Sequence, residues 1–359
     1  MRTEYKLYQK DLKVALENSL GINQLAGKSV LVTGATGTIG SFLVDEFLMF
    51  NQLHDKKISI YATSRNLKRL RETFHNESTS QLHFVEFDNL NPVRFNFKVD
   101  YIIHNAGSSS PKAFNQNPIG TIMGNVTSTY NLLQYADQSN VKRFLYISSG
   151  EVYGQDKMAS QGFSEGHTGH VEPLSERSCY PNSKRLCETL CAAFAEKRLI
   201  NVGVVRPCHT FGPKITNNDN RAHAQFLKAA LFEDSITLKS SGKQLRSYCY
   251  IADCAAGIVT VLLNGEKNSA YNIANPDAVT TIRNFAETTA RIAGKKVDYI
   301  NAEPNKNDSP IQHQVLDPSR LQSLGWHSHF TLATGIEHTL KIMQQERDRN
   351  AGRLKETSL

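Results

Sequence analysis

The sequence predicts an α/β fold built on a doubly wound parallel sheet, with a smaller C-terminal portion. Up to residue 205, short apolar, β-branched runs alternate with stretches in which apolar residues recur every three to four positions. This alternation of strands and helices is typical of a parallel sheet covered by helices on both faces. The first run, 29–33, ends at a glycine-rich loop, and the periodicity changes after Arg206. We therefore expect residues 28–205 to supply most of the sheet.

The same patterns place the elements in order. A helix is expected over 4–20, because Tyr5, Tyr8, Leu12 and Leu16 recur at helical spacing. Further helices are expected from near residue 40 and over 125–133, 222–232, 251–263, 281–292 and 332–345. Strands are expected over 29–33, 58–62, 84–88, 101–104, 143–148, 202–205 and 271–274.

The composition fits a globular protein that binds an anionic ligand. The 359 residues carry a formal net charge of +7, and 40% of them are hydrophobic. The basic residues are scattered without a Lys/Arg block, so we expect no nucleic-acid partner. Six cysteines show no CxxC pair or metal-ligand spacing with histidine, so we expect reduced thiols and no metal. Because no apolar run reaches the roughly 18 residues of a membrane span and residues 1–6 lack a signal-like apolar core, we expect no membrane partner and a cytoplasmic protein.

The loop after the first strand has the glycine spacing of a phosphate-binding turn. A strand, a glycine turn and a helix follow one another here. Glycines let the backbone approach a pyrophosphate, and the N-terminus of the helix offers free N–H groups and a partial positive charge. We therefore predict that a dinucleotide binds at this loop, through Gly34, Thr36, Gly37, Thr38, Ile39 and Gly40.

The end of the second strand predicts which dinucleotide binds. Proteins that bind NAD at such a loop carry an acidic residue here, which holds the 2′-hydroxyl of the ribose. This chain has Ser64 and Arg65 instead, with Lys68 and Arg69 beyond them. Because a guanidinium can pair with a 2′-phosphate, we predict NADP in preference to NAD.

A tyrosine and a lysine near the middle of the chain form the candidate catalytic group. Tyr180 and Lys184 lie one helical turn apart, so their side chains share one face of a helix. The ammonium of Lys184 is expected to lower the pKa of Tyr180 and stabilise its phenolate. Ser149, at the end of the strand over 143–148, could share the proton. Such a group suits removal of a proton from an alcohol while a hydride leaves its carbon.

Together these features resemble the extended short-chain dehydrogenase/reductases that act on nucleotide sugars, over roughly residues 28–345. The landmarks follow the family's order: 34–40, 104–107, 149–154, Tyr180 with Lys184, 206–207, 211–213, 246–250 and 324–326. The resemblance implies a Rossmann-type sheet and a nucleotide-diphosphate sugar as substrate. We expect a homodimer.

The resemblance also assigns expected roles to residues beyond the loop and the catalytic group. The cofactor would contact Asp88, Asn89, His104, Ala106, Gly107, Asn125 and Pro207, together with Tyr180 and Lys184. The substrate would contact Ser108, Ser149, Gly150, His209 and Arg246. The expected division is an N-terminal helical extension (1–27), a dinucleotide-binding domain (28–205, joined by 251–274), a substrate-binding portion (206–250 and 275–346) and a polar tail (347–359).

Positions close to Ser149 bear on the reaction. Dehydratases and decarboxylases of the family have Glu where this chain has Glu151, which would act at C5 of the sugar after oxidation at C4. Gly150 departs from the dTDP-glucose 4,6-dehydratases, which have Asp there, and His209 departs from relatives that have Asn. The residues around Arg177 and Arg246 look most like those of the decarboxylases.

The expected activity is therefore that of a 4,6-dehydratase-like or decarboxylase-like lyase. A nucleotide-sugar 4-epimerase or a 4-keto reductase is the alternative, because simple epimerases share the same first oxidation step. A non-catalytic NADP-sensing or RNA-binding module of the same fold is less favoured, because such proteins tend to lose the tyrosine or the lysine that this chain keeps.

Overall fold

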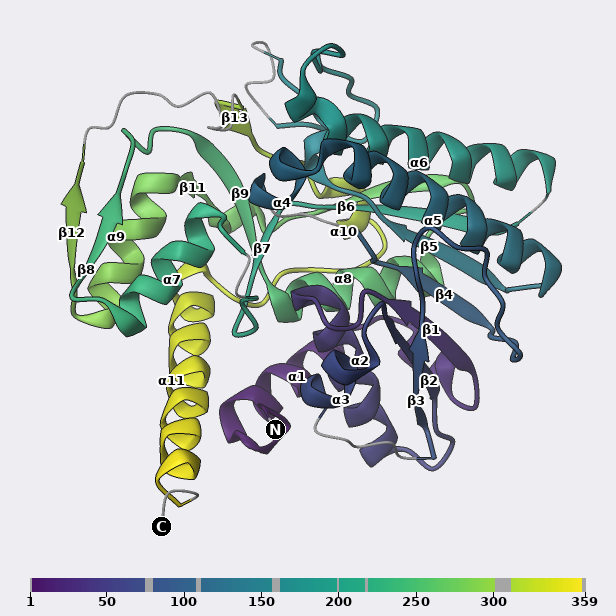
Figure 1. The fold of residues 1–359 in the computed structure, drawn as a ribbon, viewed down its shortest axis with the longest axis horizontal. Coiled ribbons are helices and arrows are strands. Elements are labelled where there is room, and N and C mark those ends of the chain that lie inside the picture. The colour runs from purple at the N-terminus through teal and green to yellow at the C-terminus, as the bar shows by residue number, and fades with distance from the viewer. Residues whose placement is uncertain are drawn as a thin grey trace.

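A seven-stranded parallel sheet forms the centre of the protein (Figure 1). The computed structural model describes residues 2–74, 80–107, 111–156, 162–198, 200–216, 219–300 and 311–356. The strand order is β10-β6-β5-β4-β1-β2-β3, and every neighbouring pair is parallel. The strands are β1 (Ser29–Thr33), β2 (Ser59–Ser64), β3 (Leu82–Glu86), β4 (Tyr101–His104), β5 (Arg143–Ile147), β6 (Val202–Pro207) and β10 (Ser269–Ile273). The predicted fold class is confirmed.

Alternate strand residues face two separate hydrophobic cores, as a sheet covered on both faces requires. Leu31 and Ile102 pack into the core under α5 (Pro118–Gln138) and α6 (Cys179–Lys197). Val30 and Ile103 pack into the larger core, to which α2 (Thr38–Leu53) and α8 (Ile251–Asn264) contribute. The short helix α3 (Leu67–Thr73) contacts β2 and β3. A second short helix, α4 (Pro111–Gln116), contacts α5.

The chain after β6 builds a smaller region beside the carboxyl ends of the strands (Figure 1). One sheet contains β7 (His209–Phe211), β9 (Leu245–Tyr250), β11 (Val279–Thr281) and β13 (His313–Gln314). A second sheet pairs β8 (Ser235–Leu238) with β12 (Lys296–Tyr299). The helices of this region are α7 (Ala222–Phe232), α9 (Ile282–Ala293) and α11 (Leu332–Glu356), whereas α10 (Ser319–Gln322) contacts β10 of the central sheet. Short 3₁₀ turns lie at η1 (Arg2–Glu4), η2 (Ile22–Leu25), η3 (Gly150–Tyr153), η4 (Glu176–Ser178) and η5 (Pro276–Ala278).

The N-terminal helix α1 (Lys6–Asn18) lies against both regions rather than standing apart. Its fully buried Asp11 accepts hydrogen bonds from the Tyr250 hydroxyl at 2.6 Å and pairs with Nδ1 of His338 at 2.7 Å. The Tyr8 hydroxyl donates to Asp45 of α2 at 2.8 Å. These polar contacts join α1 to α2, β9 and α11. None of the described helices combines the length and apolar character needed to cross a bilayer.

Glu46 makes stability depend on pH. This fully buried carboxyl on α2 accepts a hydrogen bond from Ser19 at 2.5 Å, and burial raises its pKa from 4.5 to about 8. The unfolded chain therefore ionises Glu46 at a lower pH than the folded protein does. Its contribution to stability is fully present below about pH 4.5 and is lost as the pH rises to about 8, by a few kcal/mol, since one pKa unit corresponds to about 1.4 kcal/mol.

Glu46→Gln should remove this pH dependence, because the amide cannot ionise but keeps the acceptor for Ser19. We expect the melting temperature of the variant to rise relative to that of the wild-type protein between pH 5 and pH 8. Thermal denaturation across this range measures the difference, and parallel profiles for the two proteins would rule out the buried neutral carboxyl.

Candidate active site at the carboxyl ends of the strands

The predicted phosphate-binding loop leads from β1 into α2 and has the close backbone approaches that glycine permits. Gly34 has φ of +64°, and a Cβ there would lie 2.9 Å from the carbonyl oxygen of Asn105. A Cβ on Gly40 would lie 2.4 Å from the Gly34 carbonyl oxygen. Gly37 is the N-cap of α2 and has no side chain to bond the N–H groups of the first turn. Those N–H groups suit a pyrophosphate, so the loop fits a dinucleotide.

Thr33 and His104 hold the ends of β1 and β4 together. The Thr33 hydroxyl accepts hydrogen bonds from the backbone N–H groups of Asn105 and Ala106, each at 3.0 Å. Nδ1 of His104 lies 2.8 Å from the same hydroxyl, and Nε2 lies 3.2 Å from Oγ1 of Thr129. Burial lowers the pKa of His104 to about 3. Because both ring nitrogens are engaged inside the protein, the His104 side chain is part of the framework beneath the predicted cofactor site.

The end of β2 combines an exposed cation with a nearby acid that sequence reasoning missed. Arg65 is exposed, and the Ser64 hydroxyl accepts a hydrogen bond from the Asn66 N–H at 3.2 Å. The strand register places Glu86, the last residue of β3, opposite Ser64. Asp88, two residues further on, accepts hydrogen bonds from Leu90 N–H and from Asn91, and it therefore closes its own turn; Asn89 lies within that turn.

Ser149, Tyr180 and Lys184 converge beyond the end of β5. Tyr180 and Lys184 are each 5% exposed, and burial raises the pKa of Tyr180 while the neighbouring Ser149 side chain acts to lower it. Nζ of Lys184 donates to the Ile147 carbonyl at 2.8 Å and lies 5.9 Å from the centroid of the Tyr180 ring. Burial lowers the pKa of Lys184 to about 8.

The prediction that Lys184 lowers the pKa of Tyr180 is wrong. Burial, followed by the negative charge of Glu151, raises the pKa of Tyr180 to about 12. The groups that act in the other direction are Ser149, Arg221 and Arg177. The spacing of Tyr180 and Lys184 places both side chains on one face of the helix. It does not show where the Lys184 ammonium points, so it could not predict the effect on the pKa of Tyr180.

Glu151 forms an ion pair with Arg177. The guanidinium donates to both carboxylate oxygens at 3.1–3.2 Å, and the two side chains are 15% (Arg177) and 19% (Glu151) exposed. The guanidinium carbon also lies 4.6 Å from the centroid of the Phe114 ring, which stacks on Tyr180 with centroids 5.2 Å apart. Sequence analysis singled out the surroundings of Arg177 but did not predict either contact.

A second arginine, Arg221, enters the site from the loop before α7 and was not predicted. It forms a bidentate pair with Asp219 at 2.9 and 2.6 Å. Burial alone would lower the pKa of Arg221, but the hydrogen bond to Asp219 and the charges of Tyr180 and Glu151 raise it. A narrow hollow bounded by Thr38, Asp219 and Arg221 connects this loop with the phosphate-binding loop. A local DNR triplet is too common a pattern to reveal this from sequence.

The predicted substrate residues His209 and Arg246 lie close together on β7 and β9. Burial lowers the pKa of His209 well below its usual range, with the positive charge of Arg246 acting in the same direction. Arg246 is 3% exposed, and its guanidinium donates to the carbonyl oxygens of Leu245, Ile311 and Gln312. No described carboxylate forms a salt bridge with it, so Arg246 brings an unneutralised positive charge to this region.

The remaining predicted residues line the same strand ends. A Cβ on Gly107 would lie 2.7 Å from Oδ1 of Asn125 and 3.7 Å from Nζ of Lys184, which places these three residues together. A Cβ on Gly150 would lie 3.0 Å from Leu316, so the departure to glycine leaves room for that side chain. Pro207 ends β6. The predicted substrate residue Ser108 lies outside the described residues.

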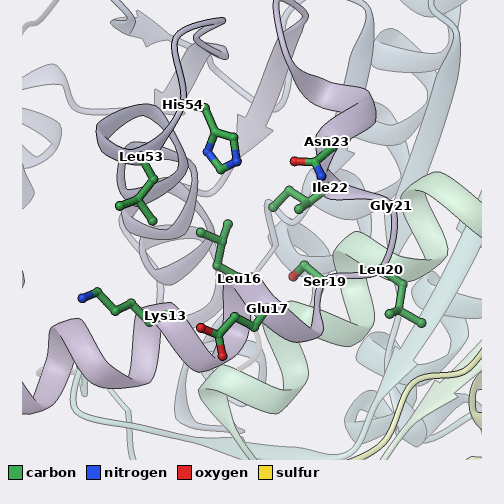
Figure 2. A pocket seen from close by; sticks show the side chains of 10 residues that line it. All are labelled: Lys13, Leu16, Glu17, Ser19, Leu20, Gly21, Ile22, Asn23, Leu53 and His54. Atoms are coloured by element: carbon green, nitrogen blue, oxygen red, sulfur yellow. The ribbon is translucent and has the colours of Figure 1, made fainter.

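A larger pocket lies away from these residues (Figure 2). It has a volume of about 570 Å³ and is bounded by the end of α1, by η2 and by Leu53 and His54 at the end of α2. Because α2 runs from the glycine loop at Thr38 to Leu53, this pocket is at the opposite end of the helix from the candidate site. Among the described residues, no group of three or more His, Cys, Asp and Glu side chains could hold a metal ion.

Comparison with known proteins agrees with this geometry. The model of the NAD dependent epimerase/dehydratase family matches residues 30–274. UDP-glucuronic acid decarboxylase 6 of Arabidopsis thaliana is 32% identical over 315 residues, 86% of each chain. UDP-glucuronic acid decarboxylase 1 of Danio rerio is 30% identical over 324 residues, 90% of this chain and 74% of the relative.

A solved structure shares the fold. The UDP-glucuronic acid 4-epimerase of Bacillus cereus, in complex with UDP-glucuronic acid and NAD, superposes with a TM-score of 0.73 at 21% identity, over 89% of this chain and 99% of that one. At this identity the likeness establishes the fold. The matched length, the 30–32% identity to the decarboxylases and the shared fold together place the chain in the NAD-dependent epimerase/dehydratase family of enzymes.

Proposed function

We propose that this protein is a nucleotide-sugar decarboxylase, which oxidises C4 of a nucleotide uronate and then breaks the bond between C5 and its carboxylate. The observation that carries the proposal is the position of Tyr180 and Ser149 beside a Glu151 carboxylate that Arg177 already neutralises. Gly150 has no acidic side chain to protonate a leaving C6 hydroxyl, which disfavours dehydration. The decarboxylases at 30–32% identity support the same choice.

The residues present fit a nicotinamide dinucleotide. The N–H groups at the start of α2 would hold its pyrophosphate, and Gly107 and Asn125 would lie along its nicotinamide half, close to Lys184. When bound, this cofactor accepts the hydride from C4 and later returns it. The matching family is NAD-dependent, and the Bacillus cereus epimerase was solved with NAD.

The chain's own residues would manage the proton and the charges. Tyr180 would take the proton of the C4 hydroxyl, with Ser149 sharing the hydrogen bond. The Ser149 side chain and the positive charges of Arg221 and Arg177 would stabilise the phenolate that forms. Arg221 and Arg246 would supply positive charge for the diphosphate and the carboxylate of the substrate.

Arg65→Ala tests the preference for NADP. Arg65 is exposed at the end of β2, where its guanidinium could pair with a 2′-phosphate. We expect the variant to lose on the order of 1.5–3 kcal/mol of NADP binding and to bind NAD unchanged. Calorimetry with both dinucleotides measures this, and Lys68→Ala is the control because Lys68 is exposed on the same segment. Equal or tighter NAD binding by the wild-type protein would overturn the preference, and Glu86 would then be the candidate acid for the ribose.

Incubation with UDP-, dTDP-, GDP- and CDP-linked sugars, followed by mass spectrometry, tests the proposed function. We expect loss of carbon dioxide from a nucleotide uronate. Loss of water, an unchanged mass with inverted C4, or gain of a hydride would instead identify a dehydratase, an epimerase or a reductase. The homodimer and the cytoplasmic location stay predictions.

A further inference from the structure

Arg177 contacts Glu151 directly and reaches the Tyr180 ring through Phe114. Its guanidinium holds both oxygens of Glu151 and lies over the ring of Phe114, whose other neighbour in the stack is the ring of Tyr180. The Phe114 and Tyr180 rings are stacked and nearly parallel, with an interplanar angle of 11°. Arg177 therefore sets the position of the Glu151 carboxylate. Through Phe114 it also supports the Tyr180 ring, which carries the reacting hydroxyl.

We propose that Arg177 is a positioning residue that keeps the Glu151 carboxylate from acting as a base at C5, and so commits the site to cleavage of the carbon–carbon bond. This role rests on the proposed decarboxylation, and it makes Arg177 the residue that selects decarboxylation over proton removal at C5. It does not require Arg177 to touch the reacting atoms.

Two reactions compete once C4 of a uronate is a ketone. In one, a base takes the hydrogen of C5 as a proton, and the electron pair of the C5–H bond passes to the C4 oxygen as an enolate. In the other, the bond between C5 and the carboxylate breaks, carbon dioxide leaves, and the electron pair of that bond passes to the C4 oxygen to give an enolate that lacks the carboxylate; a proton from solvent then adds at C5. The first reaction needs a basic carboxylate beside C5, whereas the second does not.

The contacts of Glu151 occupy the oxygens that would otherwise take the C5 proton. A bidentate guanidinium occupies lone pairs on both carboxylate oxygens, which must be released before either oxygen can take a proton. Arg221 and Arg246 add positive charge from the loop before α7 and from β9, and both act electrostatically on Glu151. The partial burial of the pair strengthens this attraction relative to water. The neutralised pair also admits a substrate carboxylate that an unpaired Glu151 would repel.

The wild-type protein provides a test that needs no variant. When it converts a nucleotide uronate in deuterated water, the unreacted uronate recovered at half conversion should carry no solvent deuterium at C5. Deuterium in the recovered uronate would show that a base works at C5 and would overturn the proposal.

Substitutions at Arg177 sharpen the test. In Arg177→Met, which keeps a long side chain over Phe114, carbon dioxide release should fall at least tenfold, and the recovered uronate should now carry solvent deuterium at C5. The double variant Arg177→Met with Glu151→Gln should lose the exchange again, and Arg177→Lys should show less exchange than Arg177→Met because it keeps the charge. The Michaelis constant for the uronate should rise in Arg177→Met, because Glu151 would then repel the substrate.

A folded Arg177→Met protein without increased exchange, or exchange that persists with Gln at position 151, would contradict the proposal. These outcomes differ from a failure of the proposed function, in which the wild-type protein would release no carbon dioxide from any nucleotide uronate.

Discussion

Tyr180→Phe should abolish turnover while leaving the fold intact. The substitution removes the hydroxyl that takes the proton, whereas the remaining ring keeps its stacking on Phe114. Loss of a general acid–base group typically costs roughly 10²–10⁴ in rate, and we expect a loss within this range. Steady-state assays of product formation, together with circular dichroism and thermal melting, measure both parts of the expectation.

Tyr153→Phe is the matched control. Tyr153 is also buried, and burial also raises its pKa to about 12, but its hydroxyl bonds to Asn272 at 2.7 Å and to Arg206 at 2.9 Å. The control should lose about 1 kcal/mol of stability for the missing hydrogen bonds and keep its rate within a few-fold. Substantial turnover in folded Tyr180→Phe would refute the assignment of the proton acceptor.

Asp11→Ala should cause the largest loss of stability, on the order of 3–5 kcal/mol. Asp11 is fully buried, and its removal leaves the Tyr250 hydroxyl and the His338 ring without their common partner. Tyr250 ends β9, the strand that also carries Arg246, so the Michaelis constant for the substrate should rise as well. Denaturant unfolding and substrate kinetics test the two effects.

Glu17→Ala on the same helix provides the comparison. Glu17 is exposed, and we expect the change to stay within about 0.5 kcal/mol, as is usual for surface substitutions. If Asp11→Ala were equally mild, α1 would not join the two regions in the way that its buried contacts indicate.

The features that the sequence predicted well are those with local patterns. The strand, glycine turn and helix at Gly34 to Gly40 follow from residue types that few other structures tolerate, and alternating apolar segments specify the parallel sheet. The helical spacing of Tyr180 and Lys184 likewise places them together beside Ser149. In each case, the information lies within a few neighbouring residues.

The features that the sequence did not predict depend on contacts between distant segments. The partner of Glu151 is Arg177, 26 residues away, and the carbonyl groups around Arg246 include two from positions 311 and 312. His104 matches a cofactor-binding motif, yet its ring bonds to Thr33, 71 residues before it. Arg221 enters the site only because the loop before α7 returns to the strand ends. Spacing along the chain carries none of this information.

The most direct test of the account is the reaction of the wild-type protein with UDP-glucuronate, the substrate named for its decarboxylase relatives, in deuterated water. The account predicts a product that lacks the carboxylate and carries one solvent deuterium at C5, formed without net consumption of the dinucleotide. A product that keeps the carboxylate, whether with inverted C4 or with the elements of water removed, would contradict it.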